Sequence, residues 1–337
     1  MSRPLRRQQI QLDVTSRYHI TSRCVRKMRL TDDPARKDFM LGWLKRLHEV
    51  FAVEVCRYAL MGNHFHLILR INPKMAAGWS DREVVRRWAQ LHPPRDGRKR
   101  MRDELLESWI EVQTHRPEFV AAIRARLADM GQFMKDFKQR VAEVFNKADE
   151  AVGAFWQGRY TCVPLEGEAQ LLACMAYVDL NPHAARLCDK PEDDPHTSLH
   201  ESVQSRDKEA QIRRKLRLPA TEKLPAQALR LGQRAAEIKH GHDGLKNPQK
   251  IAIVPDAERH GWTVPVGTTS THSRQGLFSN LRLEDYLRLV DFVAKKLRDG
   301  KAQLDAATAD ILERLQTPAN DWLAEIARWL GGRFATA

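Results

Sequence analysis

Cysteines are scarce in this sequence of 337 residues, and none of them is spaced for a metal site or a redox motif. The five are odd in number and form no Cys-x-x-Cys pair. Most lie inside apolar patterns such as LLACMAYV, so we expect reduced, buried thiols with no disulfide or zinc role. The five are Cys24, Cys56, Cys162, Cys174 and Cys188.

Long apolar runs are also missing. No stretch approaches the ~20 apolar residues of a membrane span, and residues 1–30 contain no apolar run of signal-peptide length. With 17 glycines, 16 prolines and 42% hydrophobic residues, the chain is neither collagen-like nor of low complexity, and it can form a folded core. We therefore expect a cytoplasmic protein without a membrane partner. Its net charge of +13 adds the expectation that it is associated with the nucleoid.

Acidic residues are also few relative to basic ones. The chain has 56 lysines and arginines but 43 aspartates and glutamates, which gives a net charge of +13. Such an excess favours a polyanionic partner, of which nucleic acid is the first hypothesis. The excess gathers in residues 1–30, with 8 basic and 1 acidic side chains, and in residues 206–250, with 12 and 5. Solvated charge in a linker remains an equal interpretation of the second stretch.

Apolar periodicity predicts an α+β organisation. Alternation indicates strands, spacing of three and four indicates helices, and Gly62-Asn63 is turn chemistry between two β-rich runs. The predicted strands cover 17–25, 53–61, 64–71 and 154–164, and the predicted helices cover 35–51, 132–146, 168–180, 281–298 and 311–334.

We predict three regions. Residues 1–200 form the main domain, interrupted at about 73–131 by a charge-laden helical insertion. Residues 201–280 form a basic linker that we expect to be flexible, and residues 281–337 form a helical C-terminal region.

The sharpest local motif is a histidine pair at the start of a strand. His64 and His66 lie at positions i and i+2, whose side chains share one face of a strand, and paired imidazoles are common ligands of a divalent metal. Two polar residues on the wet face of a sheet would show the same spacing, so the motif alone leaves both interpretations open.

A second motif lies on the helix predicted at 168–180. Tyr177 and Asn181 are four residues apart and share one helix face. Each also has a structural interpretation, Tyr177 as a packing aromatic and Asn181 as a cap. Beside His64 and His66, however, they would supply a nucleophilic phenol and an amide-oxygen ligand, which suits phosphodiester cleavage. A hard cation, Mg²⁺ or Mn²⁺, would assist attack on phosphorus, and Zn²⁺ ranks second because no thiolate ligand is apparent.

With these motifs in view, the chain resembles the HUH-type tyrosine transposases, and within them the group associated with repetitive extragenic palindromes, which carries the IS200-like transposase domain. The resemblance extends over about residues 14–200. It rests on four segments in order, YHITSRC at 18–24, MGNHFHLILRI at 61–71, FWQGRYTCVPL at 155–165 and YVDLNPHAARL at 177–187.

The resemblance implies a ferredoxin-like or RRM-like antiparallel sheet flanked by helices. It implies that His64, His66 and Asn181 ligate the metal and that Tyr177 is the nucleophile. Relatives cleave single-stranded DNA at hairpins, form a 5′-phosphotyrosine and leave a 3′-OH that can reverse the reaction, which needs no nucleotide cofactor. Relatives often read NPVRAG where this chain reads NPHAAR, so the backbone after Asn181 can differ. The oligomeric state, monomer or homodimer, is left open.

Hairpin recognition would use basic and aromatic side chains of the main domain. Trp156 fits a core position equally well, and Arg159 fits a salt bridge. The candidates for DNA contact are Arg17, Arg23, Arg26, Lys27, Lys135, Lys138, Arg140, Trp156, Arg159 and Tyr160.

Two other functions compete with a single-strand DNA endonuclease and strand transferase. One is a non-catalytic regulator that binds hairpins, and the other is a zinc hydrolase that uses His64 and His66. Neither needs Tyr177: the regulator would bind hairpins unchanged in Tyr177→Phe or with a chelator, whereas the hydrolase would contain zinc and keep its activity in Tyr177→Phe.

Overall fold

The computed structural model describes residues 10, 12–96, 99–206, 262–267, 275–279 and 281–295. The helix predicted at 311–334 and most of the linker predicted at 201–280 lie outside these residues. No helix within the described ranges is long and apolar enough to cross a membrane.

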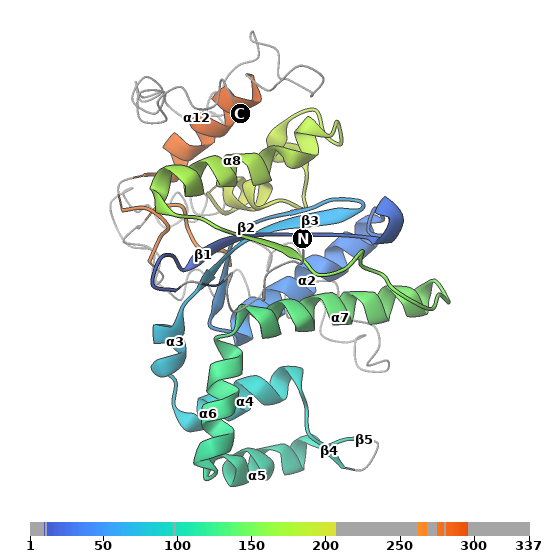
Figure 1. The fold of residues 1–337 in the computed structure, drawn as a ribbon, viewed down its shortest axis with the longest axis vertical. Coiled ribbons are helices and arrows are strands. Elements are labelled where there is room, and N and C mark those ends of the chain that lie inside the picture. Colours follow the sequence, from blue (N-terminus) through green and yellow to red (C-terminus); the bar gives the residue numbers. More distant parts are fainter. Residues whose placement is uncertain are drawn as a thin grey trace, which may run out of the picture.

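A four-stranded antiparallel sheet forms the centre of the molecule (Figure 1), and its strand order is β2-β3-β1-β6. Together with two helices it follows the order βαββαβ of a ferredoxin-like fold, which confirms the predicted fold class. The elements are β1 (Arg17–Arg23), α2 (Pro34–Val50), β2 (Val53–Leu60), β3 (His64–Ile71), α7 (Met130–Ala148) and β6 (Thr161–Pro164).

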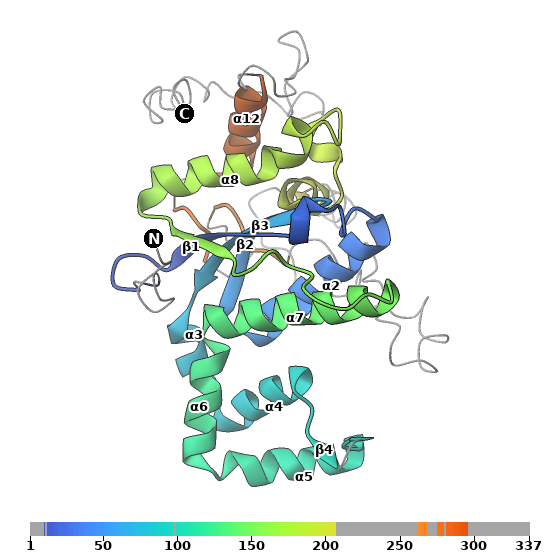
Figure 2. The ribbon, with the colours of Figure 1, turned by 45° about the vertical axis from the view of Figure 1, so that its right-hand side comes forward.

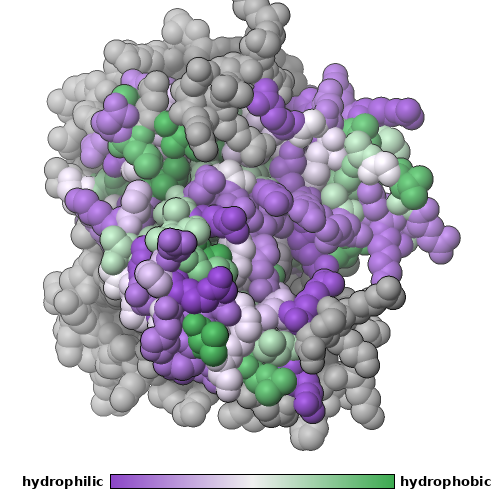
Figure 3. Space-filling view, turned by 60° about the horizontal axis from the view of Figure 1, so that its bottom comes forward, coloured by the Kyte–Doolittle hydropathy of each residue, from purple (hydrophilic) through white to green (hydrophobic). Residues whose placement is uncertain are grey.

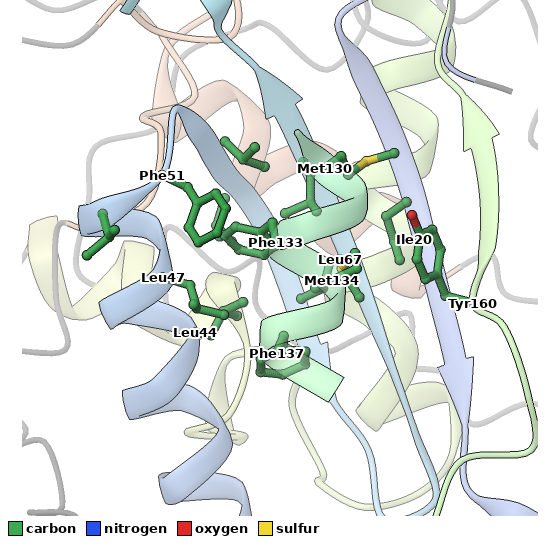
Figure 4. Packing of buried hydrophobic residues seen from close by; sticks show 14 of the residues in the cluster. Ile20, Leu44, Leu47, Phe51, Leu67, Met130, Phe133, Met134, Phe137 and Tyr160 are labelled. Carbon is green, nitrogen blue, oxygen red and sulfur yellow. The ribbon is translucent and has the colours of Figure 1, made fainter. Parts of the chain in front are cut away.

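One face of the sheet is covered by α2 and α7, and it holds the larger hydrophobic core. Because side chains alternate along a strand, Phe65 and Leu67 of β3 point to this face. The Phe65 ring packs edge-on against Phe137 of α7, at 5.2 Å between centroids. Figure 4 shows Leu67 of β3 and Ile20 of β1 beside the apolar face of α7.

The opposite face is covered by α8 (Gly167–Ala184), and α12 (Leu283–Ala294) lies beyond α8 (Figure 2). The prediction that this helix ends before Asn181 and Pro182 is wrong, since α8 continues to Ala184 with Pro182 inside it. Proline removes one backbone hydrogen bond, but Leu180, Pro182 and His183 are buried, and their packing holds the last turn.

The segment between β3 and α7 folds as a helical insertion that projects from the α7 side of the sheet (Figure 1). It also contains a short hairpin that the sequence pattern does not show. Its surface, seen from below, is largely hydrophilic with separate hydrophobic spots (Figure 3). Its elements are α3 (Pro73–Ala77), α4 (Asp81–Leu91), β4 (Arg95–Asp96), β5 (Lys99–Arg100), α5 (Asp103–Thr114) and α6 (Pro117–Leu127).

Candidate functional site

The histidine pair lies at the first residues of β3, on the face that α8 covers. His64 and His66 stand opposite Arg23 and Thr21 of β1 in the antiparallel register. Their ring centroids are 5.0 Å apart, as expected for i and i+2 on one face. The structure therefore brings both imidazoles to one point of the sheet.

Each histidine of the pair uses its Nδ1 atom for a contact with a neighbouring side chain. His64 Nδ1 is 2.6 Å from Asn63 Oδ1, and because this oxygen only accepts, Nδ1 carries the proton. His66 Nδ1 is 3.0 Å from His19 Nε2 and 3.2 Å from Thr21 Oγ1. Neither Nε2 atom of the pair hydrogen-bonds to a residue that the structure describes.

Burial keeps these imidazoles neutral. Desolvation, aided by the positive charge of Arg23, lowers the pKa of His64 to about 4. Desolvation also lowers the pKa of His66 to about 2, with further contributions from His19, His64 and Arg23. The pKa of His19 is lowered by burial as well. A neutral imidazole offers its lone pair to a metal without competition from a proton.

Tyr177 of α8 lies beside the histidines. Its ring is perpendicular to that of His66, with centroids 5.5 Å apart, and edge-on to His19 at 6.0 Å. The side chain remains 54% exposed, so a substrate can reach the phenol from solvent. Tertiary structure thus places the predicted nucleophile at the predicted metal pair.

Asn181 lies one turn further along α8. Its Nδ2 donates to the carbonyl of Tyr177 at 2.7 Å, which turns the side chain back along the helix. Within the described part of the chain, no contact joins Asn181 to the histidines.

A divalent metal fits the histidine pair. Two imidazoles that bind one ion through ~2.1 Å bonds at ligand angles of about 90–109° have ring centroids roughly 4.6–5.3 Å apart, and the observed separation is 5.0 Å. Among the residues described, no group of three or more His, Cys, Asp or Glu side chains could hold an ion. Two imidazoles are therefore the donor set that the described residues bring together at this point.

A strained basic loop borders the pair. Arg26 and Lys27 have φ values of 52° and 57°, in the left-handed region that costs a residue with a side chain about 1 kcal/mol or more. Asn63 Nδ2 donates to the carbonyl of Lys27 at 3.1 Å, so the loop conformation fixes the asparagine that contacts His64. This loop and its border contain three of the DNA-contact candidates, namely Arg23, Arg26 and Lys27.

Other candidates gather in a cleft of about 880 Å³ along α7. Lys135, Lys138, Arg159 and Tyr160 line it, and of these Lys135 and Arg159 form no ion pair with a described residue. Lys138 donates to the carbonyl of Gly158 at 2.7 Å. Because α7 and α8 cover opposite faces, this basic cleft and the histidine pair are on different sides of the sheet.

The remaining DNA-contact candidates are partly buried or form contacts within the protein. Trp156 is 9% exposed, packs against Phe65 and donates from Nε1 to the carbonyl of Lys138, so it occupies the core position that its strand-like pattern allowed. Arg140 pairs with Glu143 at 3.9 Å. Arg17 is half-buried on β1.

Sequence reasoning missed two residues at the site. His19 counted only as a polar position of the first strand, and Asn63 only as a turn residue. Their contacts depend on strand register and on the left-handed loop, and neither leaves a signal in sequence spacing.

Fold and site together define an α+β protein whose ferredoxin-like sheet carries a histidine pair beside an exposed tyrosine. No protein-family model matches the chain, and no curated protein matches it. Among solved structures, a REP-associated tyrosine transposase bound to a REP hairpin is similar, with 12% identity and a TM-score of 0.34 over 56% of this chain and 80% of that one. A likeness this distant carries no argument about function.

Proposed function

We propose that this protein is a metal-dependent single-stranded DNA endonuclease and strand transferase that acts at hairpin-bearing DNA. The observation that carries the proposal is the contact between the Tyr177 and His66 rings, 5.5 Å between centroids. It places a solvent-accessible phenol beside two neutral imidazoles, which is the arrangement that the motif resemblance implies.

In this mechanism Tyr177 attacks the scissile phosphorus through its phenolic oxygen. A bond forms between that oxygen and phosphorus, the bond from phosphorus to the 3′ oxygen breaks, and the phenol proton is lost while the leaving 3′ oxygen gains one. The 5′-phosphotyrosine conserves the ester, so attack by a 3′-OH reverses the step.

Three residues would hold the ion, namely His64, His66 and Asn181. A bound Mg²⁺ or Mn²⁺ would polarise the phosphate and stabilise the charge that develops on it. Arg26 and Lys27 of the strained loop, together with Arg23 at the end of β1, would neutralise the phosphates next to the cleaved bond. The basic cleft along α7 would hold another part of the same DNA.

The direct test is formation of a covalent adduct between the protein and a single-stranded hairpin oligonucleotide in Mn²⁺, followed by denaturing electrophoresis. We expect an adduct with wild type and none with Tyr177→Phe. Tyr18→Phe is the matched control, because it removes the phenolic oxygen of a buried tyrosine, which donates to the carbonyl of Thr15.

Two outcomes would favour the competing functions. Hairpin binding that neither Tyr177→Phe nor a chelator changes, without any adduct, would indicate a regulator. Metal-dependent hydrolysis that persists in Tyr177→Phe would indicate a hydrolase that uses His64 and His66 alone.

A further inference from the structure

His19 and Asn63 occupy equivalent positions around the histidine pair. Asn63 Oδ1 meets Nδ1 of His64 at 2.6 Å, and His19 Nε2 meets Nδ1 of His66 at 3.0 Å. Nδ1 and Nε2 lie on opposite sides of an imidazole ring. A partner at Nδ1 therefore leaves Nε2 pointing away from the partner.

We propose that His19 and Asn63 are positioning residues that hold His64 and His66 as Nδ1–H tautomers, so that both Nε2 lone pairs are presented to one divalent ion beside Tyr177. This inference rests on the proposed function for the ion and adds the residues that set the ligands. Hydrogen bonds at the distal ring nitrogen commonly fix the tautomer and orientation of metal-binding histidines.

The hydrogen bond between Asn63 and His64 can form with only one assignment of donor and acceptor. Its oxygen must accept from His64, because its Nδ2 donates to the carbonyl of Lys27 at 3.1 Å. That carbonyl is set by the left-handed backbone at Arg26 and Lys27. The strained loop thus holds the Asn63 amide in the position that orients His64.

His19 acts on the other ligand from the neighbouring strand. Its ring stacks on that of His66, with centroids 5.2 Å apart and planes 13° apart. Thr21 Oγ1 lies 3.4 Å from His19 Nε2 and 3.2 Å from His66 Nδ1, so it can share the hydrogen bond between the two rings as a third centre. His19 is not a third ligand, since no three such side chains among the described residues could hold one ion.

The tautomers can be observed without metal. Long-range ¹H–¹⁵N spectra of the full-length apo protein at neutral pH should show His64 and His66 protonated at Nδ1. His19→Leu should shift His66 towards Nε2–H, and Asn63→Ala should do the same for His64. Nε2–H tautomers in the wild type would overturn the proposal.

Metal affinity is the second readout. His19→Leu and Asn63→Ala should each weaken Mn²⁺ binding about 10–100-fold, while His19→Gln and Asn63→Asp, which keep an acceptor oxygen, should recover most of that loss. The matched controls are His115→Leu, at the exposed residue that follows α5, and Asn146→Ala, at a half-buried position of α7, and both should leave the affinity unchanged. Thermal unfolding of each variant checks that it is folded.

Electron spin-echo modulation of bound Mn²⁺ counts the coordinated imidazoles. Two imidazoles in wild type and two in His19→Leu at saturating metal support a positioning role, whereas a decrease from three to two would make His19 a ligand and overturn the proposal. Unchanged Mn²⁺ affinity in both truncations, or no Mn²⁺ binding by wild type, would also overturn it. A protein that binds Mn²⁺ through two oriented imidazoles but forms no DNA adduct would instead refute the proposed function alone.

Discussion

The two faces of the central sheet differ in what they bury. On the face beneath α2 and α7, β3 contributes Phe65 and Leu67 to a continuous hydrophobic core. On the face beneath α8, the same strand contributes His64 and His66, whose polar atoms contact other side chains. Because successive side chains of a strand point to opposite faces, β3 contributes core residues to one face of the sheet and the histidine pair to the other.

The α8 face also buries an ion pair that fixes the helix. Arg57 of β2 lies 3.4 Å from Asp179 of α8, and both are almost fully buried. Ser198 donates to Asp179 at 2.6 Å, and Tyr286 of α12 donates to it as well. Asp179 and Tyr177 are two residues apart and so lie on nearly opposite sides of α8. The buried side anchors the helix while the exposed side presents the nucleophile.

The largest expected effect is a difference in stability between substitutions at two neighbouring residues of β3, Phe65 and His66. Phe65→Ala should lower the free energy of unfolding by roughly 3–5 kcal/mol, because it opens a cavity between β3 and α7. His66→Ala should cost much less stability, since it removes a desolvated imidazole, yet abolish the DNA adduct. Denaturant unfolding together with the adduct assay measures both. Equal losses of stability would show that the faces do not differ as described.

A smaller loss is expected from the anchor of α8. Asp179→Asn keeps the shape but removes the charge that faces Arg57, and it replaces one of the two oxygens that accept from Ser198 and Tyr286 by an NH2 donor. We expect a loss of roughly 1–3 kcal/mol in denaturant unfolding. Asp189→Asn in the exposed segment after α8 is the control and should have no effect. No loss in Asp179→Asn would show that the pair contributes nothing to holding α8.

The histidine face should also make stability depend on pH. In the folded protein the pKa of His66 is lowered from 6.5 to about 2. As pH falls below 6.5, this histidine therefore takes up a proton in the unfolded chain but not in the folded one. Proton binding stabilises the unfolded state, so the free energy of unfolding decreases. Between pH 6.5 and about 5.5, wild type should lose roughly 1 kcal/mol more than His66→Gln.

Glu201 contributes with the opposite sign. Burial raises its pKa from 4.5 to about 7, so its contribution is present at low pH and lost as pH rises through 7. Because wild type and His66→Gln both contain Glu201, the difference between their unfolding curves isolates the histidine. Parallel curves would contradict the lowered pKa of His66.

The smallest effect concerns the basic cleft on the α7 side. Lys135→Ala should weaken hairpin binding several-fold and reduce the slope of log affinity against log salt by about 1. Lys74→Ala removes the same charge from α3 and should leave binding unchanged. If Lys135→Ala has no effect at low salt, DNA contacts are confined to the α8 face.

Much of the fold followed from residue patterns. The apolar, β-rich run at 64–71 predicted β3, and the i, i+2 spacing of its histidines predicted that they share one face. The turn residues Gly62 and Asn63 predicted the hairpin with β2. Helical spacing predicted α7, which proved two residues longer at each end. The end of α8 was mispredicted, because local proline chemistry was outweighed by burial of the last turn.

By itself the sequence determined the strand and helix order, the i, i+2 histidines and the four-residue spacing of Tyr177 and Asn181, because these depend on local periodicity. Only the tertiary structure decided that α8 crosses the sheet with Tyr177 beside His66, that His19 and Asn63 contact the two histidines, and that the basic cleft lies on the opposite face. Those relations depend on strand register and on the packing of distant segments, which no local pattern encodes.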